Sequence, residues 1–158
     1  MRPLFAVLAA SLALGAAPAR AQSDAHHMLD AIFQSFDENH DGFITADEAN
    51  RFIDKTFAEM DVKHTGKISR EAWIRFSFGL ADLAADQGRS DAYDRAKYKI
   101  FRRWNGGKAD GLSLADYRAG VLGDAEKGVG RHGGRELKID FAAFQRAPFV
   151  RQLMSALH

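Results

Sequence analysis

The sequence predicts an all-α fold that consists of helix–loop–helix units in series. Three observations support this fold class. Apolar residues pair at helical spacing ahead of three polar loops, as Phe33 with Phe36, Phe57 with Met60, and Phe101 with Trp104. Glycine lies near the middle of each loop, and an Ile or Leu follows it. With 158 residues and 46% apolar side chains, the chain suits one small domain with its own core.

Residues 1–21 have the order of a secretory signal peptide. Arg2 precedes an apolar run from Leu4 to Leu14, and Ala19-Arg20-Ala21 forms a small-x-small cleavage site. We expect cleavage after Ala21, which would leave residues 22–158 as a single domain in the periplasm or outside the cell. The alternative is a buried apolar N-terminal helix. No later segment has the roughly 20 apolar residues that a membrane-spanning helix requires.

Composition and charge argue against several classes of protein. The chain has no cysteine, so we expect neither disulfides nor a lipid-attached cysteine. Without Arg2 and Arg20, 20 of the 22 basic side chains remain against 21 acidic ones. A net charge near −1 does not favour nucleic acid or an anionic membrane as the main partner.

Nothing in the sequence predicts an enzyme. The chain has no nucleophile motif, no phosphate-binding loop and no paired carboxylates outside the loop described below. The histidines form no metal set, because the adjacent His26 and His27 diverge by about 100° on a helix. The basic segment Arg95–Lys108 places its aromatic residues at core positions, so we interpret its charges as a solvated helix face.

The helices are expected, in chain order, at residues 25–36, 46–60, 70–86, 91–104, 114–122 and 140–156. Thr45 and Ser113 are predicted N-caps of the helices that follow them. A turn at Gln87 and Gly88 precedes Ser90, which we predict as the N-cap of the fourth helix.

The loop from Asp37 to Glu48, DENHDGFITADE, has the strongest functional signal. It matches the calcium-loop pattern D-x-[DN]-x-[DN]-G-x5-E at every specified position. Calcium takes roughly six to eight oxygen ligands at about 2.3 to 2.6 Å. Asp37, Asn39 and Asp41 supply side-chain oxygens at the first, third and fifth positions, and we predict them as calcium ligands.

The second half of this loop completes the predicted ligand set. Gly42 permits the sharp bend that lets Phe43 offer its backbone carbonyl at the seventh position. Thr45 is suited to hold a coordinating water and to cap the next helix, with Glu48 three residues on as in a capping box. Since Glu48 cannot be cap and bidentate ligand at once, we expect it to bind the ion when calcium is present.

Phe33 and Phe36, the loop DENHDGFITADE, and Phe52 and Ile53 together resemble the EF-hand family over residues 28–56. The surrounding chain resembles the short-spaced EF-hand proteins of bacterial periplasms. The resemblance implies that Ile44, at the eighth position, lies in the short strand by which EF-hand loops pair, and that it points inward. The alternative is an acidic turn between two helices.

The loop 61–72 keeps the shape of the motif but not its ligands. Lys63 places an ammonium where an oxygen ligand belongs, and Ala72 lacks the closing carboxylate, so we expect no calcium there. We hypothesise that Lys63 replaces the ion's charge by interacting with Asp61.

The loop 105–116 is a second degenerate copy. It keeps Leu112 at the eighth position, Ser113 as N-cap and Asp116 at the end, but Gly111 comes one position late. Shifting the register by one residue corrects the position of Gly111 but loses both end ligands. Either register leaves too few side-chain oxygens for good calcium affinity.

A weaker echo of the motif spans residues 132–143, where Ile139 and Asp140 match the eighth and ninth positions and Ala143 lacks the closing carboxylate. Gly128 and Gly130 interrupt the chain ahead of it, so we expect no entering helix. A decayed EF-hand and an ordinary loop before the last helix fit this pattern equally well.

Only twelve residues, Ala49 to Met60, separate the first two loops, and as a helix they span about 18 Å. If this helix is straight, the two loops lie at its opposite ends and cannot pair. If it bends near residues 54–56, they can. The sequence is compatible with both arrangements.

The predicted function is calcium binding by an exported protein that acts as a calcium-responsive interaction module. Ion binding would reorient the helix after the loop and expose a groove for a protein partner, lined by Phe33, Phe52, Phe57 and Met60. One alternative is a structural or buffering protein whose ion opens nothing. Another is an accessory subunit of an exported complex.

Overall fold

Helices make up most of the described chain, which confirms the predicted all-α class. The computed structural model describes residues 17–130 and 136–158. The predicted signal peptide falls mainly on residues 1–16, outside the described residues. None of the helices in the described ranges is long and apolar enough to cross a membrane.

The helices are α1 (Ala17–Phe36), α2 (Ala46–Met60), α3 (Arg70–Arg75), α4 (Ala81–Asp86), α5 (Ser90–Trp104), α6 (Leu114–Val129), α7 (Phe141–Arg146) and α8 (Pro148–Ser155). The strands are β1 (Ile44–Thr45), β2 (Lys67–Ile68), β3 (Leu112–Ser113) and β4 (Lys138–Ile139). Each strand ends one or two residues before the next helix begins, so each strand lies at the end of a loop and leads into a helix.

The strands pair across the chain in two antiparallel sets. β1 pairs with β4, where Ile44 lies opposite Ile139, and β2 pairs with β3, where Ile68 lies opposite Leu112. All four side chains are buried, which confirms the prediction that Ile44 points inward. The loop 37–48 is therefore joined to the segment that precedes α7, and the loop 61–72 is joined to the loop 105–116.

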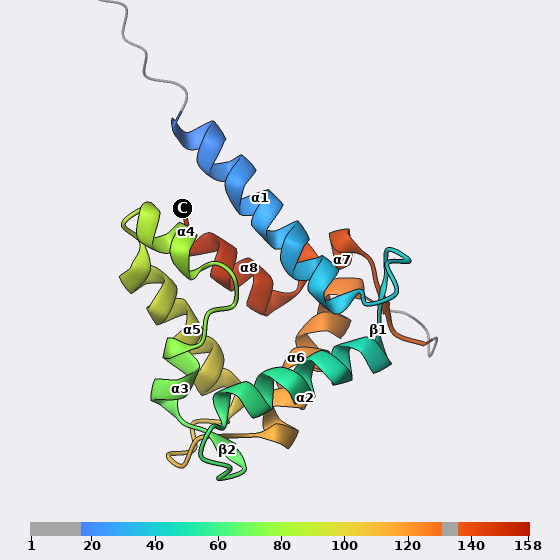
Figure 1. Ribbon diagram of the computed structural model, residues 1–158, viewed down its shortest axis with the longest axis vertical. Coiled ribbons are helices and arrows are strands. Elements are labelled where there is room, and N and C mark those ends of the chain that lie inside the picture. Colours follow the sequence, from blue (N-terminus) through green and yellow to red (C-terminus); the bar gives the residue numbers. More distant parts are fainter. Residues whose placement is uncertain (1–16, 131–135) are drawn as a thin grey trace, which may run out of the picture.

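Helix α2 explains this pairing. It is continuous from Ala46 to Met60, and β1 and β2 lie at its opposite ends (Figure 1). The straight arrangement is thus the observed one, and the first two loops do not pair with each other. Helix α6 packs against α2 and is its counterpart, since it follows β3 and leads toward β4.

The prediction that no helix enters the segment 132–143 was wrong. Helix α6 continues past residue 122 to Val129 and ends at Gly130, whose φ of +79° lies in the left-handed region. Gly128 lies inside α6, where α7 crosses it closely. A Cβ atom at Gly128 would lie 2.3 Å from the carbonyl oxygen of Ala143, so only glycine permits this approach.

Two predicted helices are each broken into two. The segment 70–86 separates into α3 and α4 because Phe76 is extended, with ψ of 124°, and Gly79 has φ of +81°. The segment 140–156 breaks at Ala147, which is extended because Pro148 follows it. Ser90 is the first residue of α5, and no side-chain hydrogen bond caps that helix.

The apolar side chains form two hydrophobic cores, one for each pair of strands. The β2–β3 core includes Phe57, Trp73 and Tyr117, and the β1–β4 core includes Phe33 and Phe144. Several partly buried side chains contact both cores, namely Ile32, Leu122, Phe149 and Met154. Each pair of loops therefore has its own core, and the two cores meet between α1, α6 and α8.

Candidate metal centre

Asp37 closes the loop 37–48 by hydrogen bonds to the backbone. It follows α1 directly and is only 1% exposed. Its carboxylate accepts hydrogen bonds from the N–H groups of Asp41 at 3.1 Å and Gly42 at 2.9 Å. Gly42 has φ of +86°, a conformation that glycine adopts without strain. The first predicted ligand thus sets the curvature of the loop.

The third and fifth predicted ligands belong to the same network. Asn39 Oδ1 accepts from the Asp41 N–H at 2.9 Å, and Asp41 Oδ1 accepts from the Phe43 N–H at 3.0 Å. Asn39 Nδ2 donates to Asp41 Oδ2 at 3.2 Å. Both side chains are exposed. The loop therefore places amide and carboxylate oxygens, the ligands calcium prefers, within a few residues of each other.

Glu48 joins the two ends of the loop. The Thr45 hydroxyl accepts from the Glu48 N–H at 3.3 Å, and Glu48 Oε2 accepts from the Thr45 N–H at 2.9 Å and from the Thr45 hydroxyl at 2.8 Å. This is the predicted capping box. Glu48 Oε1 also accepts from the Asn39 N–H at 3.4 Å. The carboxylate that should close the calcium shell thus already faces the first half of the loop.

Glu48 is only 2% exposed, and its environment favours the charged form. Burial alone would raise its pKa, but the hydrogen bonds from the Thr45 N–H, the Thr45 hydroxyl and the Asn39 N–H together lower the pKa of Glu48 below its ordinary value. A buried carboxylate that stays ionised is a suitable ligand for a cation.

The loop 37–48 has strong negative charge. It contains five acidic side chains and no Lys or Arg, the acidic ones being Asp37, Glu38, Asp41, Asp47 and Glu48. Glu38 pairs with Arg51 at 2.8 Å. Within the described residues, Asp37, Asp41 and Glu48 take part in no ion pair. Because neighbouring carboxylates repel one another, a bound divalent cation would relieve this repulsion.

The predicted ligands are close in sequence but not all aimed at one point. In the part of the chain that the structure describes, no three His, Cys, Asp or Glu side chains are grouped as a metal site. Two of the five predicted ligand groups, the Asn39 amide and the Phe43 carbonyl, do not belong to those four side-chain types. Glu48, which does, is hydrogen-bonded to Thr45. Coordination by the whole set requires Glu48 Oε2 to leave Thr45.

The ring of Phe43 lies outside the cores. It is 41% exposed, and the ammonium of Lys138, on the paired strand β4, lies 5.9 Å from its centroid. These two residues could not be connected from the sequence, because the pairing of β1 with β4 was not predicted. Only the backbone of Phe43 is available to the predicted calcium shell.

The loop 61–72 is closed by the same hydrogen bonds from backbone N–H groups to its first aspartate, but it lacks the other predicted ligands. Asp61 accepts from the N–H groups of Thr65 at 2.9 Å and Gly66 at 2.7 Å, and from the Thr65 hydroxyl at 2.9 Å. Lys63 forms no ion pair with any described residue, so the hypothesis that it replaces the ion beside Asp61 was wrong. Hydrogen bonds from Thr65 and Gly66 hold Asp61.

A lysine does contact the closing carboxylate of the loop 105–116. Lys108 Nζ lies 2.9 Å and 3.2 Å from the two carboxylate oxygens of Asp116, and this contact lowers the pKa of Asp116. The buried Asn105 closes the loop by accepting from the Gly107 N–H at 2.9 Å and donating to the Lys108 carbonyl at 3.0 Å. An ion pair between Lys67 and Asp110 links this loop to the loop 61–72.

The segment 132–143 contributes a strand and a helix cap. Residues 132–135 lie outside the described residues. Ile139 pairs with Ile44, and Asp140 caps α7 by accepting from the Ala143 N–H at 2.7 Å. This segment is thus the structural partner of the predicted calcium loop.

Sequence reasoning missed one buried charged residue, Lys97 on α5. It was assigned to a solvated basic face, but it is buried. The signal was present in the sequence: Tyr93, Lys97, Ile100 and Trp104 follow one another at helical spacing on the apolar face.

Comparison with known families supports the identity of the loop. A family model described as EF hand matches residues 29–53, which include the end of α1, the whole loop 37–48 and the first half of α2. No curated protein and no solved structure matches the chain. The family match supports calcium binding in general terms, and calcium as the ion.

Proposed function

We propose that this chain is an exported protein that binds one calcium ion through Asp37, Asn39, Asp41, the Phe43 carbonyl and Glu48. The observation that carries the proposal is the pair of buried carboxylates, Asp37 and Glu48, in an acidic loop where, among the described residues, only Glu38 forms an ion pair. Calcium would supply the positive charge that Lys108 supplies to Asp116 in the loop 105–116. The proposal assigns no catalytic role to the chain.

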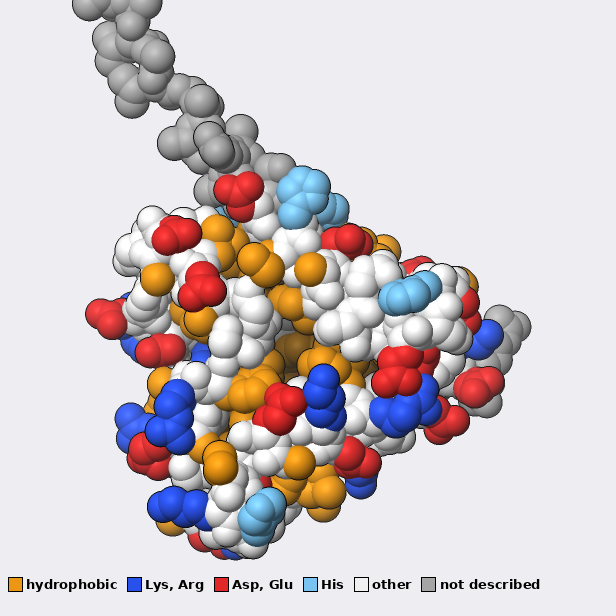
Figure 2. Space-filling model, in the orientation of Figure 1, with side chains coloured by type: hydrophobic (Ala, Val, Ile, Leu, Met, Phe, Trp, Pro, Cys, Tyr) orange, Lys and Arg blue, Asp and Glu red, His pale blue; other side chains and the backbone are white. Residues whose placement is uncertain are grey.

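We further propose that calcium controls an interaction surface. Phe36, the last residue of α1, and Phe52 of α2 stack with ring centroids 3.6 Å apart. Both line a cavity that opens at the centre of one face (Figure 2). Because Glu48 lies in the first turn of α2, its movement onto an ion would shift α2 relative to α1. The predicted groove is corrected in part: Phe52 lines the cavity, whereas Phe33, Phe57 and Met60 are buried in the cores.

The order of residues 1–21 supports export to the periplasm or beyond. Extracellular calcium modules bind with dissociation constants of roughly 0.1 to 1 mM, so a modest affinity is sufficient there. A hundredfold excess of calcium over that constant would stabilise the fold by about 2.7 kcal/mol.

The strand pairing favours a second candidate function, in which the ion is structural. Since β1 pairs with β4, the predicted calcium loop joins α1 and α2 to α6 and α7, which lie far apart in the sequence. An ion at this place would stabilise the connection between the two ends of the domain without opening a surface.

One titration separates the two functions. Calcium is added to the purified protein while the melting temperature and the fluorescence of a hydrophobic dye are followed, with magnesium as the control ion. The interaction module predicts that both signals rise, and a structural ion predicts a rise in melting temperature alone. If neither signal changes, or if Glu48→Gln responds as the wild type does, the calcium site itself is disproved.

A further inference from the structure

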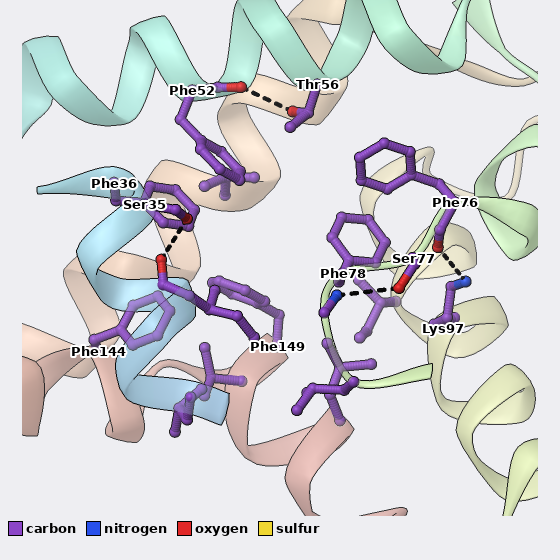
Figure 3. A pocket seen from close by; sticks show the side chains of 18 of the residues that line it. Ser35, Phe36, Phe52, Thr56, Phe76, Ser77, Phe78, Lys97, Phe144 and Phe149 are labelled. Atoms are coloured by element: carbon purple, nitrogen blue, oxygen red, sulfur yellow. Dashed lines mark hydrogen bonds between the residues drawn. The ribbon is translucent and has the colours of Figure 1, made fainter. Parts of the chain in front are cut away.

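A cavity of about 340 Å³ lies between the two hydrophobic cores. Its walls come from α1, α2, the segment 73–80, α5, α6 and the chain from α7 to α8. In Figure 3, Phe36, Phe52, Phe144 and Phe149 line one side of it, and Phe76 and Phe78 line the other. Cavities of this size, lined mainly by aromatic and aliphatic side chains, are typical of small-molecule sites.

Most polar groups along the cavity bond to one another or reach solvent. The hydroxyls of Thr56 and Tyr117 lie 3.0 Å apart, and the Ser35 hydroxyl donates to the Ile32 carbonyl at 2.6 Å. Lys55 and Glu59, on α2, are exposed. One charged side chain that lines the cavity is buried, and its charge remains to be explained.

That side chain is Lys97, which is only 1% exposed. Its ammonium donates to the carbonyl of Phe76 at 2.7 Å and to the carbonyl of Ile74. An ammonium has three N–H donors, so a third is left for another acceptor. No carboxylate in the described residues forms an ion pair with Lys97. Desolvation by burial lowers the pKa of Lys97 to about 8, with Asp94 opposing the shift, so the group is still mostly charged at neutral pH.

The Ile74 and Phe76 carbonyls account for the position of Lys97. The rings of Tyr93 and Phe78, with centroids 5.4 Å and 5.6 Å from its ammonium, offset part of the cost of burying the charge, but no carboxylate in the described residues neutralises it. The Ile74 and Phe76 carbonyls lie at the end of α3, where helix carbonyls lack intrahelical partners and a donor is needed. A neutral donor would satisfy them. A buried ammonium adds a large desolvation cost, which is normally offset by an anion. The missing anion points to a ligand that brings its own.

We propose that this cavity binds a small amphipathic carboxylate, with its hydrocarbon chain between the aromatic walls and its carboxylate on the ammonium of Lys97. The apolar walls favour a flexible aliphatic body, and Lys97 supplies the only buried positive charge among the residues that line the cavity. The inference stands apart from the calcium site, because it uses neither the loop 37–48 nor any predicted calcium ligand.

The test compares two probes of equal chain length, decanoate and 1-decanol, on the purified wild-type protein. Both tryptophans of the chain, Trp73 and Trp104, line the cavity, so their fluorescence reports its occupancy. We expect decanoate to bind about tenfold more tightly than 1-decanol, because a hydrogen bond to a charged group adds that much affinity. Equal affinities, or no change in tryptophan emission with decanoate, would overturn the proposal.

Variants locate the head group. Lys97→Met should weaken decanoate binding about tenfold and leave 1-decanol binding unchanged, while Lys97→Arg should keep the preference for the carboxylate. Lys99→Met, an exposed position on the same helix, is the matched control and should change neither. If Lys97→Met does not fold, the comparison of the two probes on the wild type still decides. A loss of both ligands in a folded Lys97→Met protein would mean that Lys97 only shapes the cavity, and would also contradict the proposal.

Discussion

The two loops at the ends of α2 share a backbone plan and differ in charge. Asp37 accepts from the Gly42 N–H at 2.9 Å, and Asp61 accepts from the Gly66 N–H at 2.7 Å. The loop 37–48 has five acidic and no basic residues, whereas the loop 61–72 has three basic residues and two acidic ones. The first aspartate and the central glycine therefore form the same turn in both loops. Asp41 and Glu48 are replaced by Thr65 and Ala72 in the loop 61–72, and only the loop 37–48 keeps the carboxylates that we predict as calcium ligands.

The difference extends to the partner of each loop. An ion pair between Lys67 and Asp110 links the loops 61–72 and 105–116, and a second, between Lys108 and Asp116, lies within the loop 105–116. The loop 37–48 is joined to β4 through backbone pairing, and Lys138 of β4 lies over the ring of Phe43. Among the described residues, the one ion pair of this loop is that of Glu38 with Arg51. Lysines thus neutralise carboxylates in the loops of the β2–β3 pair, whereas we propose that an added cation does so in the loop 37–48.

The largest expected effect tests this contrast directly. Glu48→Gln removes a buried anionic ligand, so the calcium affinity should fall about 100-fold, or about 2.7 kcal/mol, in calorimetry. Asp61→Asn is the matched control in the other loop and should leave calcium affinity nearly unchanged. Equal losses in the two variants would mean that the loops do not differ as proposed.

A second prediction perturbs only the β2–β3 pair. Gly111 has φ of +102°, and a Cβ atom there would lie 2.7 Å from the Ile68 carbonyl oxygen, so Gly111→Ala should lower the free energy of unfolding by about 1–3 kcal/mol. Denaturant unfolding measures this change. Gly123→Ala, in open space within α6, should instead raise the free energy of unfolding by about 0.5–1 kcal/mol.

The same Gly111→Ala variant sharpens the comparison when calcium is added. Under conditions where it is folded, its calcium affinity should equal that of the wild type, because the predicted ligands lie in the other pair. A large loss of affinity would show that the two pairs are coupled through α2.

The sequence was informative where chemistry is local. The pattern in residues 37–48 predicted a loop whose Asp37, Asn39, Asp41 and Glu48 lie in one hydrogen-bonded network, and Thr45 caps α2 as expected. Whether these groups bind calcium stays a prediction. Helix breaks were harder to foresee. The carbonyls of Ile74 and Phe76 at the break after α3 accept hydrogen bonds from Lys97, which is distant in sequence.

Long-range pairing could not be obtained from the sequence. The joining of β1 to β4 depends on α2 being straight and on α6 continuing to Val129. Gly128 appeared to interrupt that helix, because glycine disfavours helix interiors. Glycine is required at this position because α7 approaches closely, and helix propensity does not take account of such a tertiary contact.

The smallest expected effect concerns the lysine in the loop 105–116. Lys108→Met should reduce the free energy of unfolding by less than about 1 kcal/mol at neutral pH, because the Lys108 and Asp116 side chains are partly exposed and screened. The pKa of Asp116 is lowered in the folded protein, so this stabilisation is complete above the ordinary Asp pKa and is lost as pH falls through the lowered value.

Unfolding curves of wild type and Lys108→Met should therefore differ slightly at neutral pH and converge in acid. A difference that grows as the pH falls would show that the ion pair with Asp116 is not what Lys108 contributes.

The most direct test of the central claim, that one loop of this protein binds calcium and the others do not, is the stoichiometry of calcium binding measured by calorimetry on the purified protein, with magnesium as the control ion. The account predicts one calcium per chain, lost in Glu48→Gln. Two or more calcium ions per chain, or none at all, would contradict it.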